Sequence, residues 1–277
     1  MGLLIVDESK CKQDGICAAI CPSHVIGLGG KDKFPKIPTR LENGCIQCGH
    51  CVSVCPHGAL DHRLVPKASC PPIDPSLLIT ERQAEQFLRS RRSVRVFKDD
   101  KVEKEKIQRL IEIARYAPTA GNSQPITWRV VTDRKTLERT ADLTADFLQH
   151  VIDTRQKGDY PVYYPAMVKG HKAGQDPIVR RAPVLLIAST PEMRSNGTVD
   201  ISLAFSYLEL MAPNLGLGTC WAGLVYSALL NDARVRELLG LPEDAGHYYA
   251  MLLGYPKFKF QRLPMRRPPK IDWGQEL

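Results

Sequence analysis

The amino-acid sequence predicts an α+β protein in two parts, a small cysteine-rich module followed by a larger domain in which helices alternate with strands. Seven of the nine cysteines precede residue 56. A proline-rich stretch then separates this segment from one with clear helical and strand periodicities. At 277 residues the chain is long enough for two domains. We therefore expect a module at residues 1–61, a linker at 62–79 and a second domain at 80–277.

The cysteines of the first module form two spaced sets. The second set reads C-x2-C-x2-C-x3-C-P, a spacing that places three thiolates around one iron–sulfur cluster and sends the fourth to another cluster. The first set repeats this spacing, with Asp14 in the register of the missing cysteine. Cys21 and Cys55 are expected to cross over between the two clusters. The predicted ligands are Cys11, Asp14, Cys17, Cys21, Cys45, Cys48, Cys51 and Cys55.

Asp14 leaves the type of the first cluster open, because a carboxylate is a harder ligand than a thiolate. Asp14 ligates one iron of a [4Fe–4S] cluster, or that iron is labile and a [3Fe–4S] form results. In a third interpretation Asp14 is an exposed loop residue and a non-protein ligand completes the site. Zinc is the alternative for the whole set, but zinc favours two ligand pairs separated by a longer loop. We therefore predict two iron–sulfur clusters.

Local patterns predict the elements of the first module. Leu3, Ile5 and Val6 begin a short strand. Residues 17–21 and 51–55 each suit one helical turn, which the following proline ends. Such a module has little hydrophobic core, so metal binding supplies much of its folding free energy.

The second domain is predicted from its caps and periodicities. Thr80 and Gln83 form a capping box that opens a helix, and a second helix follows Asp99 or Asp100 and ends at Pro118. Further helices are expected at 200–214, apolar nearly all round, and at 234–239. Strands are expected at 94–97, 127–132, 183–189 and 248–253.

Two segments of the second domain are distinguished by their composition. Residues 149–175 are aromatic and proline-rich, and they suit either a lid over a bound ligand or a surface excursion. Residues 256–277 are basic and proline-rich. We expect the latter to form an extended arm that lies on another subunit.

One arginine-rich motif of the second domain suggests a phosphate-bearing ligand, and two further motifs accompany it. Guanidinium groups pair bidentately with phosphate, although a basic helix end is also favoured by the helix dipole. The motifs are Arg91-Arg92-Ser93-Val94-Arg95, the segment Ala117-Pro118-Thr119-Ala120-Gly121-Asn122-Ser123-Gln124-Pro125, and Leu217-Gly218-Thr219-Cys220-Trp221-Ala222-Gly223.

In combination these motifs resemble the FMN-dependent nitroreductase family, from about Thr80 to the end of the chain, with a two-cluster ferredoxin module fused ahead of it. The resemblance implies an α+β sheet domain that forms a homodimer by exchanging its C-terminal arm, with FMN at the interface. It also implies the cofactor-binding residues Arg91, Arg92, Ser93, Arg95, Pro118, Thr119, Asn122, Ala222, Gly223 and Arg262. Pro118, Thr119 and Asn122 would reach the flavin from the partner, and Ala222 and Gly223 would direct backbone N–H groups at flavin N5. Many relatives have a basic residue where this chain has Phe260, so Lys259 substitutes or that contact is lost.

Charge and composition limit the kinds of partner that we expect this chain to bind. The net charge is +8, and residues 1–61 are neutral with six Lys/Arg and six Asp/Glu, so all of it lies in residues 62–277. The basic residues carry no nucleic-acid motif, which favours a phosphate-bearing cofactor or an acidic redox partner. No apolar run approaches the ~20 residues that span a bilayer, and the first residues lack the features of a signal peptide. We expect a cytoplasmic protein without nucleic-acid or membrane partners.

The resulting prediction is an oxidoreductase that passes electrons from two clusters to FMN and on to a small organic acceptor, with a low-potential protein as donor. In this interpretation the cofactor carries the chemistry, so no side chain is predicted as catalytic. The alternative is a redox sensor or electron carrier that turns over no organic substrate. Cys70 and Cys220 have no predicted role.

Overall fold

The structure is a computed structural model, and it describes residues 2–28, 34–194 and 196–274. The chain divides into two compact units. The cluster unit contains Met1–Ile79 together with Thr119–Gln124, and the sheet unit contains Thr80–Pro118 and Pro125–Leu277. Residues 29–33 of the predicted module and 275–277 of the predicted arm lie outside the described residues.

The cluster unit consists of short elements around the cysteine motifs. Strand β1 (Leu4–Val6) pairs with β4 (Leu60–His62), and β2 (Gly27–Leu28) pairs with β3 (Pro35–Lys36), both antiparallel. The two predicted helical turns are present as α1 (Ile16–Ala19) and α2 (His50–Val54). The buried core is small and includes cysteines: Leu3, Cys17, Cys21, Val25, Ile26, Ile37 and Leu60.

The two cysteine motifs have the same backbone conformation. Gln13 and Gln47 both have positive φ angles, 57° and 53°. Gly15 and Gly49, which precede the helical turns, have φ angles of 74° and 73°, a region that glycine enters without steric cost. Because the repeat is structural as well as chemical, Asp14 occupies the same place in its motif as Cys48 does in the other.

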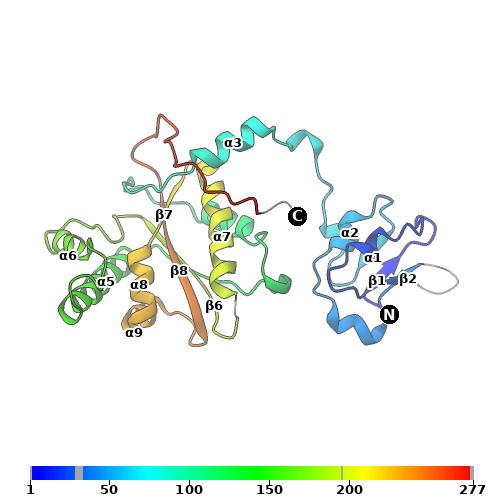
Figure 1. The fold of residues 1–277 in the computed structure, drawn as a ribbon, viewed down its shortest axis with the longest axis horizontal. Coiled ribbons are helices and arrows are strands. Elements are labelled where there is room, and N and C mark those ends of the chain that lie inside the picture. Colours follow the sequence, from blue (N-terminus) through cyan, green and yellow to red (C-terminus); the bar gives the residue numbers. More distant parts are fainter. Residues whose placement is uncertain (1, 29–33, 195, 275–277) are drawn as a thin grey trace. The chain divides into compact units, whose positions relative to one another are not determined.

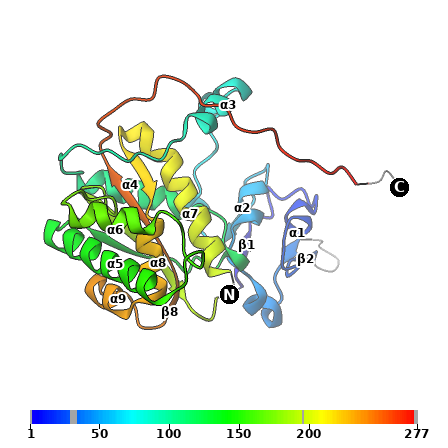
Figure 2. The same ribbon diagram turned by 60° about the vertical axis from the view of Figure 1, so that its left-hand side comes forward.

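The sheet unit is built on a four-stranded antiparallel sheet with helices on both faces. The strand order is β5 (Thr127–Val131), β6 (Val184–Pro191), β8 (Ala245–Gly254) and β7 (Gly218–Trp221). Figure 1 shows α7 (Gly197–Met211) running beside the long strands β6 and β8. Figure 2 shows α5 (Arg134–Thr154), α6 (Tyr164–Lys172), α8 (Gly223–Asn231) and α9 (Ala233–Leu239) grouped together.

The side chains of β6 alternate between two hydrophobic cores, as the period of a strand requires. Leu185 and Ile187 pack in the core that contains α5, α8 and α9. Val184, Leu186 and Ala188 face the other core, with α4 (Lys104–Ala114) and α7. A sheet covered on both faces explains why β6 is apolar from Val184 to Ala188.

Several predicted elements are confirmed. The capping box of Thr80 and Gln83 opens α3 (Glu81–Ser90). The expected helices at 200–214 and 234–239 correspond to α7 and α9, and the expected strands at 127–132, 183–189 and 248–253 correspond to β5, β6 and β8.

One expectation for the sheet unit is wrong. Residues 94–97 form no strand and make only isolated bridges on either side, from Ser93 to Thr219 and from Phe97 to Pro256. The segment 149–175, expected to be a lid or a surface excursion, is helical over much of its length: α5 continues to Thr154, and α6 packs against α5. Tyr164 and Val168 of α6 are buried in a shared apolar cluster.

Within the part of the chain that the structure describes, no helix combines the length and the apolar character that crossing a membrane requires.

Candidate functional site

The predicted cluster ligands surround two separate cavities in the cluster unit. Three ligands at each cavity come from one motif and the fourth from the other, as the crossing of Cys21 and Cys55 predicts. The first cluster site is lined by Cys11, Asp14, Cys17 and Cys55. The second cluster site is lined by Cys21, Cys45, Cys48 and Cys51.

The ligands are spaced around each cavity instead of meeting at a point. Among residues 2–28, 34–194 and 196–274, no three His, Cys, Asp or Glu side chains are close enough to hold a single metal ion. In an iron–sulfur cluster each thiolate binds a different iron, so the ligands belong at the corners of a cavity. The donor set therefore fits two clusters.

Burial disfavours the ionised form of these thiols when no metal is bound. Burial raises the pKa of the Cys51 thiol to about 11 and raises the pKa of Cys17 in the same direction. Cluster ligation requires the thiolate. Loading the sites therefore releases protons, and acid opposes it.

Asp14 lies at the first cluster site with two partners of its own. Its Oδ1 accepts a hydrogen bond from the backbone N–H of Ile16 at 3.2 Å. Its Oδ2 lies 3.5 Å from Nε2 of His57. The carboxylate therefore occupies the register of a ligand and is held in place from both oxygens.

His62 is a site residue that the sequence analysis missed, because it was placed at the start of the linker. It ends β4 and is 2% exposed. Its Nε2 lies 3.6 Å from Sγ of Cys45, and burial lowers the pKa of its imidazole. The sequence around His62, Leu60-Asp61-His62, alternates between residues of one face and the other, but three residues are too few to predict a strand.

The first arginine-rich motif of the sheet unit lies beside β7. The Val94 N–H donates to the Thr219 carbonyl oxygen at 2.8 Å, and Ser93 forms a parallel bridge with Thr219. Gly218 permits this approach, since a Cβ there would lie 2.4 Å from Cγ2 of Val94. The fold thus brings two of the three motifs together although more than 120 residues separate them.

The arginines of that motif have different surroundings. Arg91 pairs with the buried carboxylate of Glu209 at 3.3 Å, and both line a cavity of about 300 Å³ between α3 and α7. A guanidinium has five N–H donors, so one carboxylate does not exhaust it. Arg92 donates to the carbonyl oxygens of Arg89 and Arg91. Arg95 is exposed.

Ala222 and Gly223 mark the start of α8. The Ala222 N–H donates to the Ala250 carbonyl oxygen at 2.9 Å, so within the protomer this N–H is already used. Gly223 is the first residue of α8, where backbone N–H groups have no partner within the helix. A Cβ at Gly223 would meet nothing within 4 Å. Gly223 therefore offers an accessible N–H at the positive end of a helix dipole.

The remaining predicted flavin residues belong to other segments of the chain. Thr119 and Asn122 belong to the cluster unit, and Pro118 belongs to the sheet unit. The Asn122 side chain donates to the backbone carbonyl oxygens of Ile46 and Gln47, at 2.9 and 3.2 Å. Arg262 lies in the exposed C-terminal arm.

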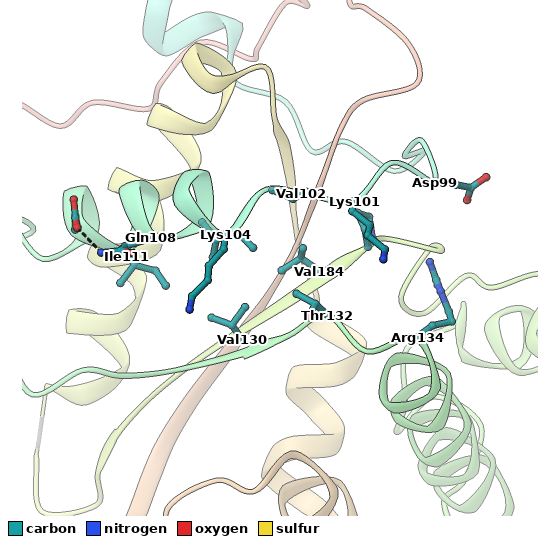
Figure 3. A pocket seen from close by; sticks show the side chains of 13 residues that line it. Asp99, Lys101, Val102, Lys104, Gln108, Ile111, Val130, Thr132, Arg134 and Val184 are labelled. Carbon is teal, nitrogen blue, oxygen red and sulfur yellow. Dashed lines mark hydrogen bonds between the residues drawn. The ribbon is translucent and has the colours of Figure 1, made fainter.

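The sheet unit also has a groove with a volume of about 770 Å³ between α4 and the edge strand β5 (Figure 3). Apolar side chains make up most of its exposed lining, and charged side chains from the start of α4, the segment before it and the start of α5 also line it. None of the predicted flavin residues is among the described residues that line it. The side chains labelled in Figure 3 belong to Asp99, Lys101, Val102, Lys104, Gln108, Ile111, Val130, Thr132, Arg134 and Val184.

The two remaining cysteines are not ligands of the cluster sites. Cys220 is buried in β7, and burial raises the pKa of its thiol, which keeps it protonated. Cys70 donates a weak hydrogen bond to the Pro66 carbonyl oxygen, with the sulfur 3.5 Å away.

Comparisons with known proteins agree with this architecture. The model of the nitroreductase family matches residues 88–255, and that of the 4Fe-4S dicluster domain matches residues 9–59. The chain belongs to the nitroreductase family and carries a ferredoxin-type domain at its N-terminus. The predicted fold class is confirmed.

Individual relatives are distant. A protein of Archaeoglobus fulgidus with the provisional name NADH dehydrogenase/NAD(P)H nitroreductase is 28% identical over 172 residues, 62% of this chain and 84% of that protein. A nitroreductase with bound FMN from Bacteroides fragilis is similar in structure, with a TM-score of 0.56 and 21% identity over 72% of this chain and 100% of the other. A variant of an FMN- and NADPH-dependent nitroreductase from a sphigopyxis strain has a TM-score of 0.53 and 25% identity, over 69% of this chain and 98% of the other.

Proposed function

We propose that this chain is an iron–sulfur flavoprotein that passes electrons from two clusters through FMN to a small organic acceptor. One observation carries the proposal: a single chain combines two cavities lined by crossed cluster ligands with the motifs of a flavin-dependent family. Fusion of the two units favours a low-potential electron-donor protein over a nicotinamide as the source of electrons. We place this activity in the cytoplasm.

The residues of the sheet unit suit the parts of FMN. Arg91, Ser93 and Arg95 supply charge-assisted and hydroxyl hydrogen bonds for a phosphate and a ribityl chain. Gly223 supplies a backbone N–H at the start of α8, where the helix dipole stabilises negative charge. FMN, when bound, supplies transfer of a hydride or of single electrons. The protein contributes orientation and electrostatics.

A homodimer is part of the proposal, and two observations support it. The arm beyond Pro256 exposes large apolar side chains: Ile271 is 57% and Trp273 is 87% exposed. The groove between α4 and β5 is apolar and lies at a sheet edge with unpaired backbone groups. We propose that the partner's arm covers this groove, and that Pro118, Thr119 and Arg262 complete the flavin site in the assembly.

Anaerobic reduction of the flavin tests the electron path. The purified protein is mixed with reduced ferredoxin, NADH or NADPH, and loss of the flavin absorbance is followed. Ferredoxin is expected to reduce the flavin in the native protein and to fail in a Cys45→Ser variant. Flavin reduction by ferredoxin at the native rate in Cys45→Ser would contradict a path through the clusters.

A further inference from the structure

The Cys45–Cys48 loop, which supplies two ligands of the second cluster site, receives hydrogen bonds from two side chains that lie outside the cysteine motifs. The first is His62 of β4. Its Nδ1 accepts hydrogen bonds from the backbone N–H groups of Leu64 and Val65, both at 3.2 Å. A ring nitrogen that accepts carries no proton, so the neutral imidazole carries its proton on Nε2. That N–H points at the Cys45 sulfur, 3.6 Å away.

The second side chain is Asn122, in a tightly folded segment. Its Oδ1 accepts from Gln124 Nε2 at 3.4 Å, which leaves both amide protons for other partners. They go to the carbonyl oxygens of Ile46 and Gln47, between the ligands Cys45 and Cys48. Asn122 has a φ of 54°, a conformation that asparagine and aspartate tolerate best among non-glycine residues.

The first cluster site has a histidine of its own, since Nε2 of His57 lies 3.5 Å from Oδ2 of the ligand Asp14, but the described residues give its loop no counterpart of Asn122. Its corresponding loop runs from Cys11 to Asp14, and no side-chain donor to the carbonyls of Lys12 or Gln13 is present in the described part of the chain. Cys55 accepts a hydrogen bond from the backbone N–H of Ala59 at 3.4 Å. One ligand position holds the Asp14 carboxylate in place of a thiolate.

Reduction adds an electron to a cluster, so N–H dipoles aimed at its ligand loop stabilise the reduced state. Hydrogen bonding and local charge are among the factors that set cluster potentials. We propose that His62 and Asn122 are positioning residues that raise the reduction potential of the second cluster above that of the first. The proposal rests on the proposed function, because it presumes that both clusters are bound.

The difference in reduction potential decides where an added electron resides in the cluster unit. At equilibrium it occupies the cluster of higher potential, which is the second. Asn122 belongs to the segment Thr119–Gln124, whose chain neighbours Pro118 and Pro125 belong to the sheet unit. The segment that supports the second cluster's loop is therefore continuous in sequence with the flavin-binding part of the chain.

Potentiometric titration of the anaerobic holoprotein, followed by EPR, tests the proposal. Asn122→Asp keeps the shape and the backbone preference of asparagine, but it removes both donors and adds an anion. His62→Asn keeps an acceptor near the Leu64 and Val65 N–H groups and removes the N–H that faces Cys45. Ser123→Ala, one residue further along the same segment, is the matched control.

Each of the first two variants is expected to lower the midpoint potential of one and the same cluster, and Ser123→Ala to leave both potentials unchanged. The affected cluster is identified by Asp14→Cys, which changes the EPR signal of the other one. Two clusters with native potentials in both variants would overturn the inference and leave the proposed function standing. Native protein without iron and sulfide would overturn both.

Discussion

The sheet unit and the cluster unit are stabilised in different ways. The sheet unit buries apolar side chains on both faces of its sheet, and Leu185, Leu186 and Ile187 are completely inaccessible to solvent. The cluster unit pairs strands of two or three residues, and two ligand cysteines form part of its small core. We therefore expect apolar burial to suffice for the first unit and metal binding to supply much of the folding free energy of the second.

Removal of the clusters should reveal the difference in stability between the two units most clearly. We expect an iron chelator with an oxidant to abolish amide protection in β1 and β4, while β6 and β8 keep theirs. Hydrogen exchange measured by mass spectrometry before and after chelation reports both units in one sample. Persistent protection of residues 4–6 and 60–62 after loss of all iron would show that the apolar core alone holds the cluster unit.

The next largest effect is expected from the C-terminal arm, whose described residues belong to neither core of the sheet unit. Truncation after Pro264 removes Ile271 and Trp273, and it should yield monomers that also lose FMN. Size-exclusion chromatography with absorbance detection measures both properties. A truncated protein that stays dimeric and yellow would show that the arm is dispensable and that the interface lies elsewhere.

A smaller effect is expected at the arginine motif. A hydrogen bond to a charged group contributes roughly 1.5–3 kcal/mol, so Arg91→Ala and Arg95→Ala should each weaken FMN binding about tenfold or more. Arg95→Ala is the cleaner variant, because Arg91→Ala also leaves the buried Glu209 without its partner. The exposed Arg89, paired with Glu85 on α3, supplies the control Arg89→Ala. Native flavin affinity in both site variants would remove these arginines from the site.

The most local effect is expected at Asp14. Asp14→Cys should give the first site four thiolates, and its cluster should then resist oxidative loss of iron. Iron content and EPR spectra after mild oxidation compare the variant with the native protein. Identical behaviour of the two proteins would mean that Asp14 is not a ligand.

Local chemistry made some of the structure predictable. The capping box at Thr80 depends on residues three positions apart, and the crossed cysteines follow from a short fixed spacing. Elements whose signal is weak were missed. Helix α5 contains several threonines. The hydroxyls of Thr140 and Thr154 donate hydrogen bonds to carbonyl oxygens four residues earlier. Pro165 lies in the first turn of α6, where proline is tolerated.

Contacts between distant segments could not be predicted at all. The motif that contains Asn122 predicts a flavin contact, yet its side chain binds carbonyls about 75 positions earlier in the chain. Gly218 admits Val94 and Pro256 against the backbone of β7, a role that depends on two segments distant in sequence. His62 acquires its role only when β4 pairs with β1 and buries it beside Cys45.

The cofactor content of anaerobically purified protein tests the central claim most directly. Iron, acid-labile sulfide, zinc and flavin are measured on the same sample and divided by the protein concentration. The account predicts iron and sulfide for two clusters and one FMN per chain. Stoichiometric zinc without sulfide, or a chain that binds no flavin, would contradict it.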